Sequence, residues 1–161
     1  MDATAGTHRK KRFDSPQQEA FLNLWRTYDC LRALEDELFA RHDLTAQQYN
    51  ALRLLRAARP AKVPTLGLAA RLVSRAPDIT RLLDKLSDRG LIDRERRDDN
   101  RRIVHVGITD VGIALLDQLA DEVRDCHLRQ LGHLKPAEMK TLVDLLRKAR
   151  SPHEGEGSDW S

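Results

Sequence analysis

The sequence has few cysteines, few aromatic residues and no long apolar run. It contains two cysteines in 161 residues, and aromatic residues make up only 4% of the chain. Cys30 and Cys126 lie far apart, each inside a helical pattern, so we expect no disulfide framework. No run of 18 apolar residues is present, so we expect no transmembrane helix. No apolar stretch follows the basic N-terminus, so we also expect no secretory signal.

Patterns typical of catalysis and metal binding are also missing. The eight glycines are scattered and form no phosphate-binding loop, and no nucleophile–base arrangement is present, so we do not expect an enzyme. The histidines and cysteines show neither HxxxH nor CxxC spacing, so we expect no metal site and no cofactor. These absences favour a binding protein.

Charge is abundant and unevenly distributed. The whole chain has a net charge of +3, but residues 53–102 contain 14 Lys and Arg against seven Asp and Glu. The rest of the chain is therefore negative. A solvated surface without a special role would mix the two signs evenly, whereas a basic segment of this kind is typical of proteins that bind a nucleic-acid duplex.

Two short helical patterns lie inside the basic segment. Apolar residues recur at helical spacing from Leu66 to Leu72 and again from Ile79 to Leu86. The link at 73–76 is short, so the two helices must cross steeply, as in a helix-turn-helix. Gly90 follows the second pattern and is suited to end that helix.

A polar hairpin follows the two helices. Residues 91–96 and 103–108 are expected to form strands, with a charged tip at 97–101. Thr109 then caps a long helix, with Asp110 in its first turn. This order of elements predicts a winged helix-turn-helix.

Amphipathic helices are expected on both sides of this lobe. Ser15 and Thr45 each begin a helix, and their apolar faces and those of the C-terminal helices exceed what a small lobe can cover. The excess predicts burial against a second chain. The predicted organisation is a flexible basic arm (1–14), an N-terminal dimerisation helix (15–44), a winged helix-turn-helix lobe (45–108), C-terminal dimerisation helices (109–149) and a disordered tail (150–161). The arm is also able to contact phosphates.

The segment L-x-x-R-G-L-I-x-R-x-R-x-x-D-N-R-R…I-T-D-x-G, starting at Leu86, resembles the signature of MarR-type transcription regulators. The resemblance extends over residues 15–149. It implies a mainly α fold with a small β-hairpin wing, a homodimer formed by the terminal helices, and a pseudo-palindromic double-stranded DNA operator. It also implies repression released by a small lipophilic or phenolic effector. We expect a cytoplasmic, nucleoid-associated protein.

The second helix of the pair is expected to place its N-terminal part against base edges. Arg81 can donate to guanine, Thr80 can contact a phosphate or a thymine methyl, and Asp78 can accept from cytosine or orient a nearby arginine. Lys85, Arg89 and Arg71 are expected to contact phosphates. The predicted DNA-binding residues are Ser74, Arg75, Pro77, Asp78, Thr80, Arg81, Lys85, Arg97, Arg101 and Arg102.

The wing departs from the family pattern at one position. The resemblance places the family's wing Asp-Arg-Arg on Asn100, Arg101 and Arg102, so the usual aspartate is missing. Asp98 or Asp99 is able to take its role of orienting an arginine. We expect Arg102 to enter a narrow minor groove, where the negative potential is strongest.

An effector site is predicted by the resemblance at Trp25, Tyr28, Arg32 and Leu52. Two aromatic residues at this spacing more often belong to an ordinary hydrophobic core, which is the alternative interpretation. Cys30 leaves open a thiol-based redox sensor, although a buried, inert cysteine is the simpler interpretation. A non-specific nucleoid- or RNA-associated basic protein without an effector is the other alternative.

Overall fold

The computed structural model describes residues 12–74 and 78–155 of the chain. Nine of its elements, in chain order, are α1 (Pro16–Ala40), α2 (Ala46–Ala58), β1 (Val63–Pro64), α3 (Thr65–Arg71), α4 (Ile79–Asp88), β2 (Ile92–Arg97), β3 (Asn100–Ile108), α5 (Asp110–Leu131) and α6 (Pro136–Arg150). The strands form one antiparallel sheet in the order β1-β3-β2. The predicted fold class, mainly α with a small β wing, is confirmed.

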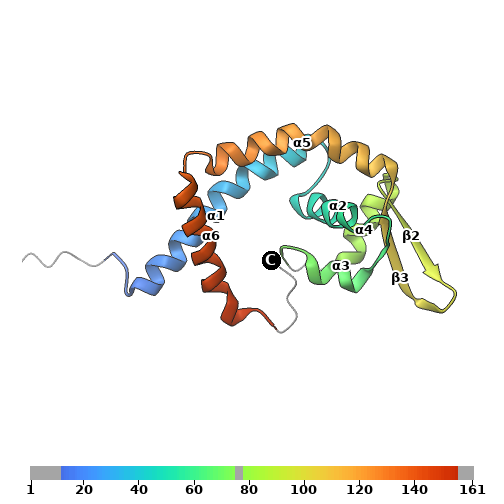
Figure 1. Ribbon diagram of the computed structural model, residues 1–161, viewed down its shortest axis with the longest axis horizontal. Helices are drawn as coiled ribbons and strands as arrows, with labels where there is room; N and C mark the ends of the chain where they lie inside the picture. The colour runs from blue at the N-terminus through green and yellow to red at the C-terminus, as the bar shows by residue number, and fades with distance from the viewer. Residues whose placement is uncertain (1–11, 75–77, 156–161) are drawn as a thin grey trace, which may run out of the picture.

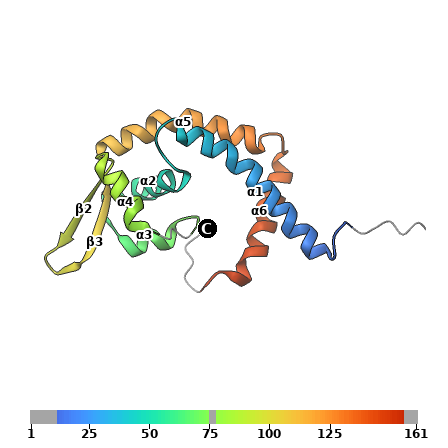
Figure 2. The same cartoon turned by 180° about the vertical axis from the view of Figure 1, so that it is seen from behind.

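The elements form an arc with two different ends (Figure 1). Helices α1 and α5 run side by side along the outside of the arc, and α2, α3, α4 and the sheet gather beneath one end of α5. The β2–β3 hairpin projects from this lobe, as the reverse view also shows (Figure 2). At the opposite end, the N-terminal half of α1 extends away from the lobe, and α6 descends from the end of α5 without packing on the lobe.

Three helices begin at the capping residues that the sequence predicts. The side chains of Ser15, Thr45 and Thr109 each accept a hydrogen bond from the backbone N–H three residues later, at 3.0 to 3.1 Å. At Thr45 the Gln48 side chain also accepts from the Thr45 N–H at 2.9 Å, which completes a capping box. Each cap pairs an N–H group that the helix itself leaves without a partner.

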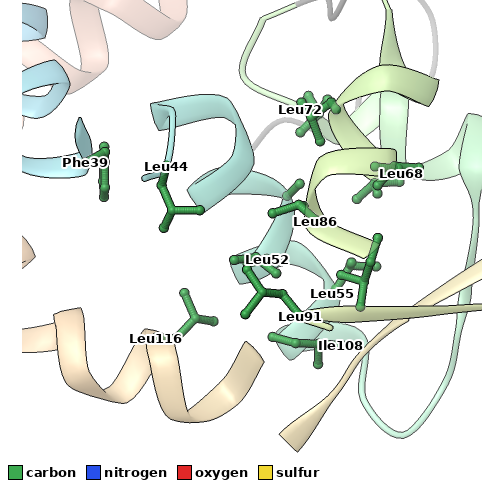
Figure 3. Packing of buried hydrophobic residues seen from close by; sticks show 14 of the residues in the cluster. Phe39, Leu44, Leu52, Leu55, Leu68, Leu72, Leu86, Leu91, Ile108 and Leu116 are labelled. Atoms are coloured by element: carbon green, nitrogen blue, oxygen red, sulfur yellow. The ribbon is translucent and has the colours of Figure 1, made fainter. Parts of the chain in front are cut away.

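The hydrophobic core lies where α2 meets the lobe and α5. Ala51, Leu52 and Leu55 of α2 are almost fully buried and pack with leucines from α3, α4 and the start of β2. The same cluster continues to Phe39 and Leu44 at the end of α1 and to Leu116 of α5, as Figure 3 shows. The lobe and the long helices therefore share one core.

Three boundaries differ from the sequence predictions. Helix α4 begins at Ile79, because Asp78 is its N-cap, so Ser74 does not lie on it. The pairing of β2 with β3 extends to Arg97 and Asn100, so the tip is shorter than expected. A solvated two-stranded ribbon tolerates charged residues within its pairing. The predicted disordered tail (150–161) begins with ordered residues, since α6 includes Arg150 and a 3-10 turn covers Ser151–His153.

A close contact joins the start of α5 to the turn that follows α4. The Thr109 hydroxyl donates to the Gly90 carbonyl at 2.6 Å, and the Thr109 N–H donates to the Leu91 carbonyl at 3.1 Å. Gly112 lies close to the backbone of Leu91 and to the side chain of Ile108. A Cβ added at Gly112 would be 2.3 Å from the Leu91 carbonyl oxygen and 2.7 Å from Ile108 Cγ1. The threonine and the glycine of the I-T-D-x-G motif therefore hold the start of α5 against the turn between α4 and β2.

We expect Gly112→Ala to lower the free energy of unfolding by about 2–3 kcal/mol, because the new methyl group must displace backbone rather than a flexible side chain. Gly67→Ala is the control, since its Cβ would meet nothing closer than 3.6 Å and alanine is the better helix former. Urea unfolding monitored by circular dichroism measures both. Equal stability of Gly112→Ala and the parent chain would contradict the packing argument.

Candidate nucleic-acid interface

The exposed start of α4 is organised by Asp78. Its Oδ1 accepts from the Arg81 backbone N–H at 2.9 Å, and Asp78 is therefore the N-cap of the helix. Thr80 and Arg81 follow in the first turn with exposed side chains, while Leu82, Leu83 and Leu86 are buried. Asp78 thus has a structural role that sequence reasoning missed, although an aspartate before a helical pattern is a known cap signal.

Helix α2 supports the chain that leads into α4. The Val73 N–H donates to Asn50 Oδ1 at 3.2 Å, and Gln47 Nε2 donates to Ser74 Oγ at 2.7 Å. Ser74 is exposed but precedes the helix. The predicted contacts Arg75 and Pro77 lie outside the described residues.

The cations of α4 fall into two groups. Within 12–74 and 78–155, no hydrogen bond or ion pair involves the side chains of Arg81 or Lys85, which are exposed. The Arg89 guanidinium instead donates to the Asp43 carbonyl at 2.7 Å and to the His42 carbonyl at 3.2 Å. The first group is available for DNA, whereas Arg89, although also exposed, is engaged with the turn before α2.

The wing tip orders its arginines through Asp98 and Asn100. Asp98 Oδ1 pairs with Arg101 Nη2 at 3.3 Å, and Asn100 Oδ1 accepts from the Arg102 backbone N–H at 3.1 Å. Of the two aspartates that the sequence offers to orient a wing arginine, Asp98 makes such a contact, with Arg101. Arg97 lies 3.8 Å from Glu95 Oε1. In the described part of the chain, the Arg102 guanidinium has no hydrogen-bond or ion-pair partner.

The base of the wing is fixed by charge. Lys62 Nζ bridges Asp93 and Glu95 at 2.6 and 2.7 Å, and these hydrogen bonds raise the pKa of Lys62 above its usual value. Arg94 Nη1 pairs with Asp84 Oδ1 of α4 at 2.8 Å. The hairpin is thus attached both to the segment before β1 and to α4. These pairs cross between distant segments, and no local sequence signal indicates them.

The residues predicted for an effector site are not brought together. Leu52 is fully buried in the core, at 0% exposure, whereas Trp25 and Tyr28 are 62% and 60% exposed. The alternative that this aromatic pair is ordinary core is therefore wrong for a single chain. Arg32 pairs along its own helix with Asp36 at 3.1 Å.

A different pocket lies between α2 and α5. It has a volume of about 290 Å³ and is lined by Tyr49, Arg53, Arg56, Ala57, Leu116 and Ala120. The Tyr49 ring stacks on Phe39 with centroids 4.6 Å apart, and burial raises the pKa of its phenol. Arg56 pairs with Asp117 at 3.1 Å across the two helices. The sequence could not reveal this pocket, because its two walls lie more than 50 residues apart.

The two cysteines differ in their surroundings. Cys126 is buried, and desolvation raises the pKa of its thiol, which disfavours the reactive thiolate. Cys30 is exposed on α1, so the interpretation of Cys30 as a buried residue is wrong for a single chain. None of the helices in the described ranges is long and apolar enough to cross a membrane.

Helix α4, exposed beside an arginine-bearing wing, has the place of a recognition helix, which is the helix that enters the major groove of DNA. These two elements together define a winged-helix DNA-binding protein. The MarR family model matches residues 44–104. A MarR transcription factor from Planctomyces limnophilus is 54% identical, with 85% of this chain and 99% of that chain covered and a TM-score of 0.68. The chain therefore belongs to the MarR family, and it is a DNA-binding transcription regulator.

Two further relatives carry functional descriptions. A mutant MarR from Escherichia coli, solved with operator DNA, is 27% identical with a TM-score of 0.73, covering 81% of this chain and 93% of that one. The transcriptional repressor MprA of Escherichia coli K12 is 25% identical, covering 86% of this chain and 80% of that protein. These relatives are regulators rather than enzymes.

We expect Asp78→Ala to lower the free energy of unfolding by about 1 kcal/mol, because the Arg81 N–H loses its cap. Asp78→Asn is the matched control: it keeps an accepting oxygen and removes the charge, so stability should change less and DNA affinity should rise. Thermal unfolding and a binding titration measure the two effects. An Asp78→Ala chain as stable as the parent would show that the cap is dispensable.

Proposed function

We propose that this chain is a homodimeric, sequence-specific repressor whose DNA binding is relieved by a small acidic effector. The observation that carries the proposal is the division of the exposed surface. In the described part of the chain, Arg81 and Lys85 of α4 and Arg102 of the wing have no side-chain partner at one end of the arc. Most of the exposed large apolar side chains belong to α1, α5 and α6. The described relatives that bind operator DNA or repress transcription support this assignment.

The dimer is supported by the state of the terminal helices. Every residue from Glu19 to Cys30 is exposed in the single chain, and α6 buries none of its side chains. The exposed apolar side chains of α1, α6 and the end of α5 include Phe21, Leu24, Trp25, Tyr28, Leu128 and Leu145. A groove of about 650 Å³, lined mainly by apolar residues of α5 and α6 that include Leu128, lies at the corner between these two helices. Exposed apolar surface of this extent is typical of a protein interface. We assign residues 15–44 and 109–149 to dimerisation, and 45–108 to DNA binding.

Sedimentation tests the dimer directly. At micromolar concentration we expect a species of twice 18.4 kDa, and Trp25→Glu together with Leu145→Glu should shift it towards the monomer. The reason is that charges placed in an apolar interface lose their hydration. Leu66→Glu, at a still more exposed apolar position on the DNA-binding lobe, is the control. A wild-type chain that sediments as a clean monomer would exclude the dimer.

A two-fold dimer would present two copies of α4 to successive major grooves. Arg81, in the first turn, is positioned to donate to guanine O6 and N7, and Arg102 would extend into the flanking minor groove. Ser74, Asp78 and Thr80 would lie at the edge of this contact, and Lys85, Arg97 and Arg101 would bind phosphates. The probe is the duplex that wild-type protein enriches most strongly from a random pool.

We expect Arg81→Ala to cost about 1–3 kcal/mol on that duplex and to relax preference at one base pair in each half-site. Arg102→Ala is the contrasting variant: its loss should be largest on duplexes with A·T-rich flanks, where the minor groove is narrow, and should leave the central preference unchanged. Titrations on two duplexes that differ only in their flanks separate the effects. An Arg81→Ala chain weakened equally on all sequences would make Arg81 a phosphate contact only.

The effector is assigned to the α2–α5 pocket. Arg53 lies there beside apolar walls of Ala57, Leu116 and Ala120, and no ion pair occupies its guanidinium in the described ranges. An aromatic or other lipophilic carboxylate fits this combination of one cation and apolar surface. Because α2 also holds the turn before α4 through Gln47 and Asn50, a ligand on α2 would disturb the DNA-reading surface.

We expect benzoate-class carboxylates at millimolar concentration to weaken binding to the selected duplex, and Arg53→Leu to remove that response while retaining DNA binding. Arg32→Leu, at the exposed residue on α1, is the matched control and should respond as the wild type does. Fluorescence anisotropy of a labelled duplex measures the response. A full response in Arg53→Leu would place the ligand elsewhere.

A further inference from the structure

The C-terminal end of α4 contacts one side of the turn between α1 and α2 (residues 41–44). Arg89 is the C-cap residue of α4, and its two terminal nitrogens donate separately to the carbonyls of Asp43 and His42, at 2.7 and 3.2 Å. The turn has a defined backbone: Asp43 has a φ of 53°, and the Leu44 N–H donates to the Phe39 carbonyl at 3.0 Å. A left-handed non-glycine residue is uncommon and reflects a fixed local structure.

The same turn is held from the other side by α5. Glu122 of α5 pairs with Arg41 Nη2 at 3.1 Å through one carboxylate oxygen and with His42 Nε2 at 3.1 Å through the other. The His42 side chain is largely buried, with 16% of it exposed. His42 therefore carries a contact to α5 on its ring and a contact to α4 on its carbonyl.

We propose that Arg89 is a positioning residue, which fixes the angle of the recognition helix relative to α1 and α5 through the 41–44 turn. The sequence-based expectation was a phosphate contact. Two of the five N–H groups of this guanidinium donate to carbonyls of the turn, which fixes the side chain against the turn. Glu122 extends the connection from the turn to α5. The inference rests on the proposed function, because the property that Arg89 controls is the reading of a specific duplex by α4.

A phosphate contact and a positioning residue have different signatures. Loss of a phosphate contact weakens all sequences alike and lowers the slope of log affinity against log salt by about 1. Loss of a positioning residue weakens the selected duplex more than an unrelated one. Substitution by lysine separates the two further, because an ammonium preserves the charge but lacks the planar, two-pronged donor that spans both carbonyls.

The experiment compares Arg89→Lys, Arg89→Ala, Lys85→Ala and Glu122→Gln with the wild type. Each is titrated at several salt concentrations against the duplex enriched from a random pool and against an unrelated duplex of equal length. We expect both Arg89 variants to lower the ratio of the two affinities about three- to tenfold, and Arg89→Lys to leave the salt slope unchanged. Lys85→Ala, one turn earlier on the same helix, should lower the slope and keep the ratio.

Glu122→Gln is the variant on the far side of the turn, on α5. It should lower the ratio in the same direction as Arg89→Lys, without a change in slope, and it carries the test together with Arg89→Lys if Arg89→Ala fails to fold. Arg89→Ala behaving like Lys85→Ala, with binding rescued in Arg89→Lys, would overturn the inference alone. A wild-type chain that enriches no sequence would overturn the proposed function and this inference with it.

Discussion

Burial of one face of α2 is the constraint on which the rest of the structure depends. Leu52 and Leu55 are inaccessible to solvent because they pack at once against the lobe, the end of α1 and the face of α5. Close-packed cores do not deform continuously. The lobe is therefore not a separate body on a flexible linker, and a displacement of α5 or α1 has to be accommodated by α2 and by the elements that α2 supports.

Around this core, charge pairs set the angles of the exposed elements. Lys62 attaches the strand before the wing tip to the segment preceding β1, and Arg94 with Asp84 joins the wing to the recognition helix. Surface pairs of this kind contribute little stability individually. Their contribution is geometric, because each one restricts the orientation of an element that has few apolar contacts of its own.

The sequence predicted most of the fold, because its signals are local. Capping residues, helical spacing and the I-T-D-x-G motif act within a few positions, and Ser15, Thr45 and Thr109 start helices as expected. The start of α4 was misplaced, because residues 73–76 were read as the whole turn and Asp78 as a base-reading residue rather than a cap. The family resemblance indicated the wing, including the missing aspartate at Asn100.

Contacts between distant segments could not be predicted. The α2–α5 pocket and the bonds from Arg89 to the 41–44 turn join residues that no periodicity relates, and a charged side chain reads the same in sequence whether it faces DNA or a carbonyl. Leu52 illustrates the same difficulty: its apolar character was compatible with a ligand crevice and with a core, and only packing decides between them.

Different positions of the recognition helix α4 have different roles. Asp78 caps it, Asp84 and Arg89 attach it, and three leucines bury its inner face, while Thr80, Arg81 and Lys85 make no side-chain hydrogen bond or ion pair with the described remainder of the chain. Substitutions at the second set remove no side-chain hydrogen bond or ion pair within the described chain. Related proteins can therefore diverge in the sequence they recognise by changing a few outward residues, and the same residues offer a starting point for redirecting this scaffold to a chosen DNA site.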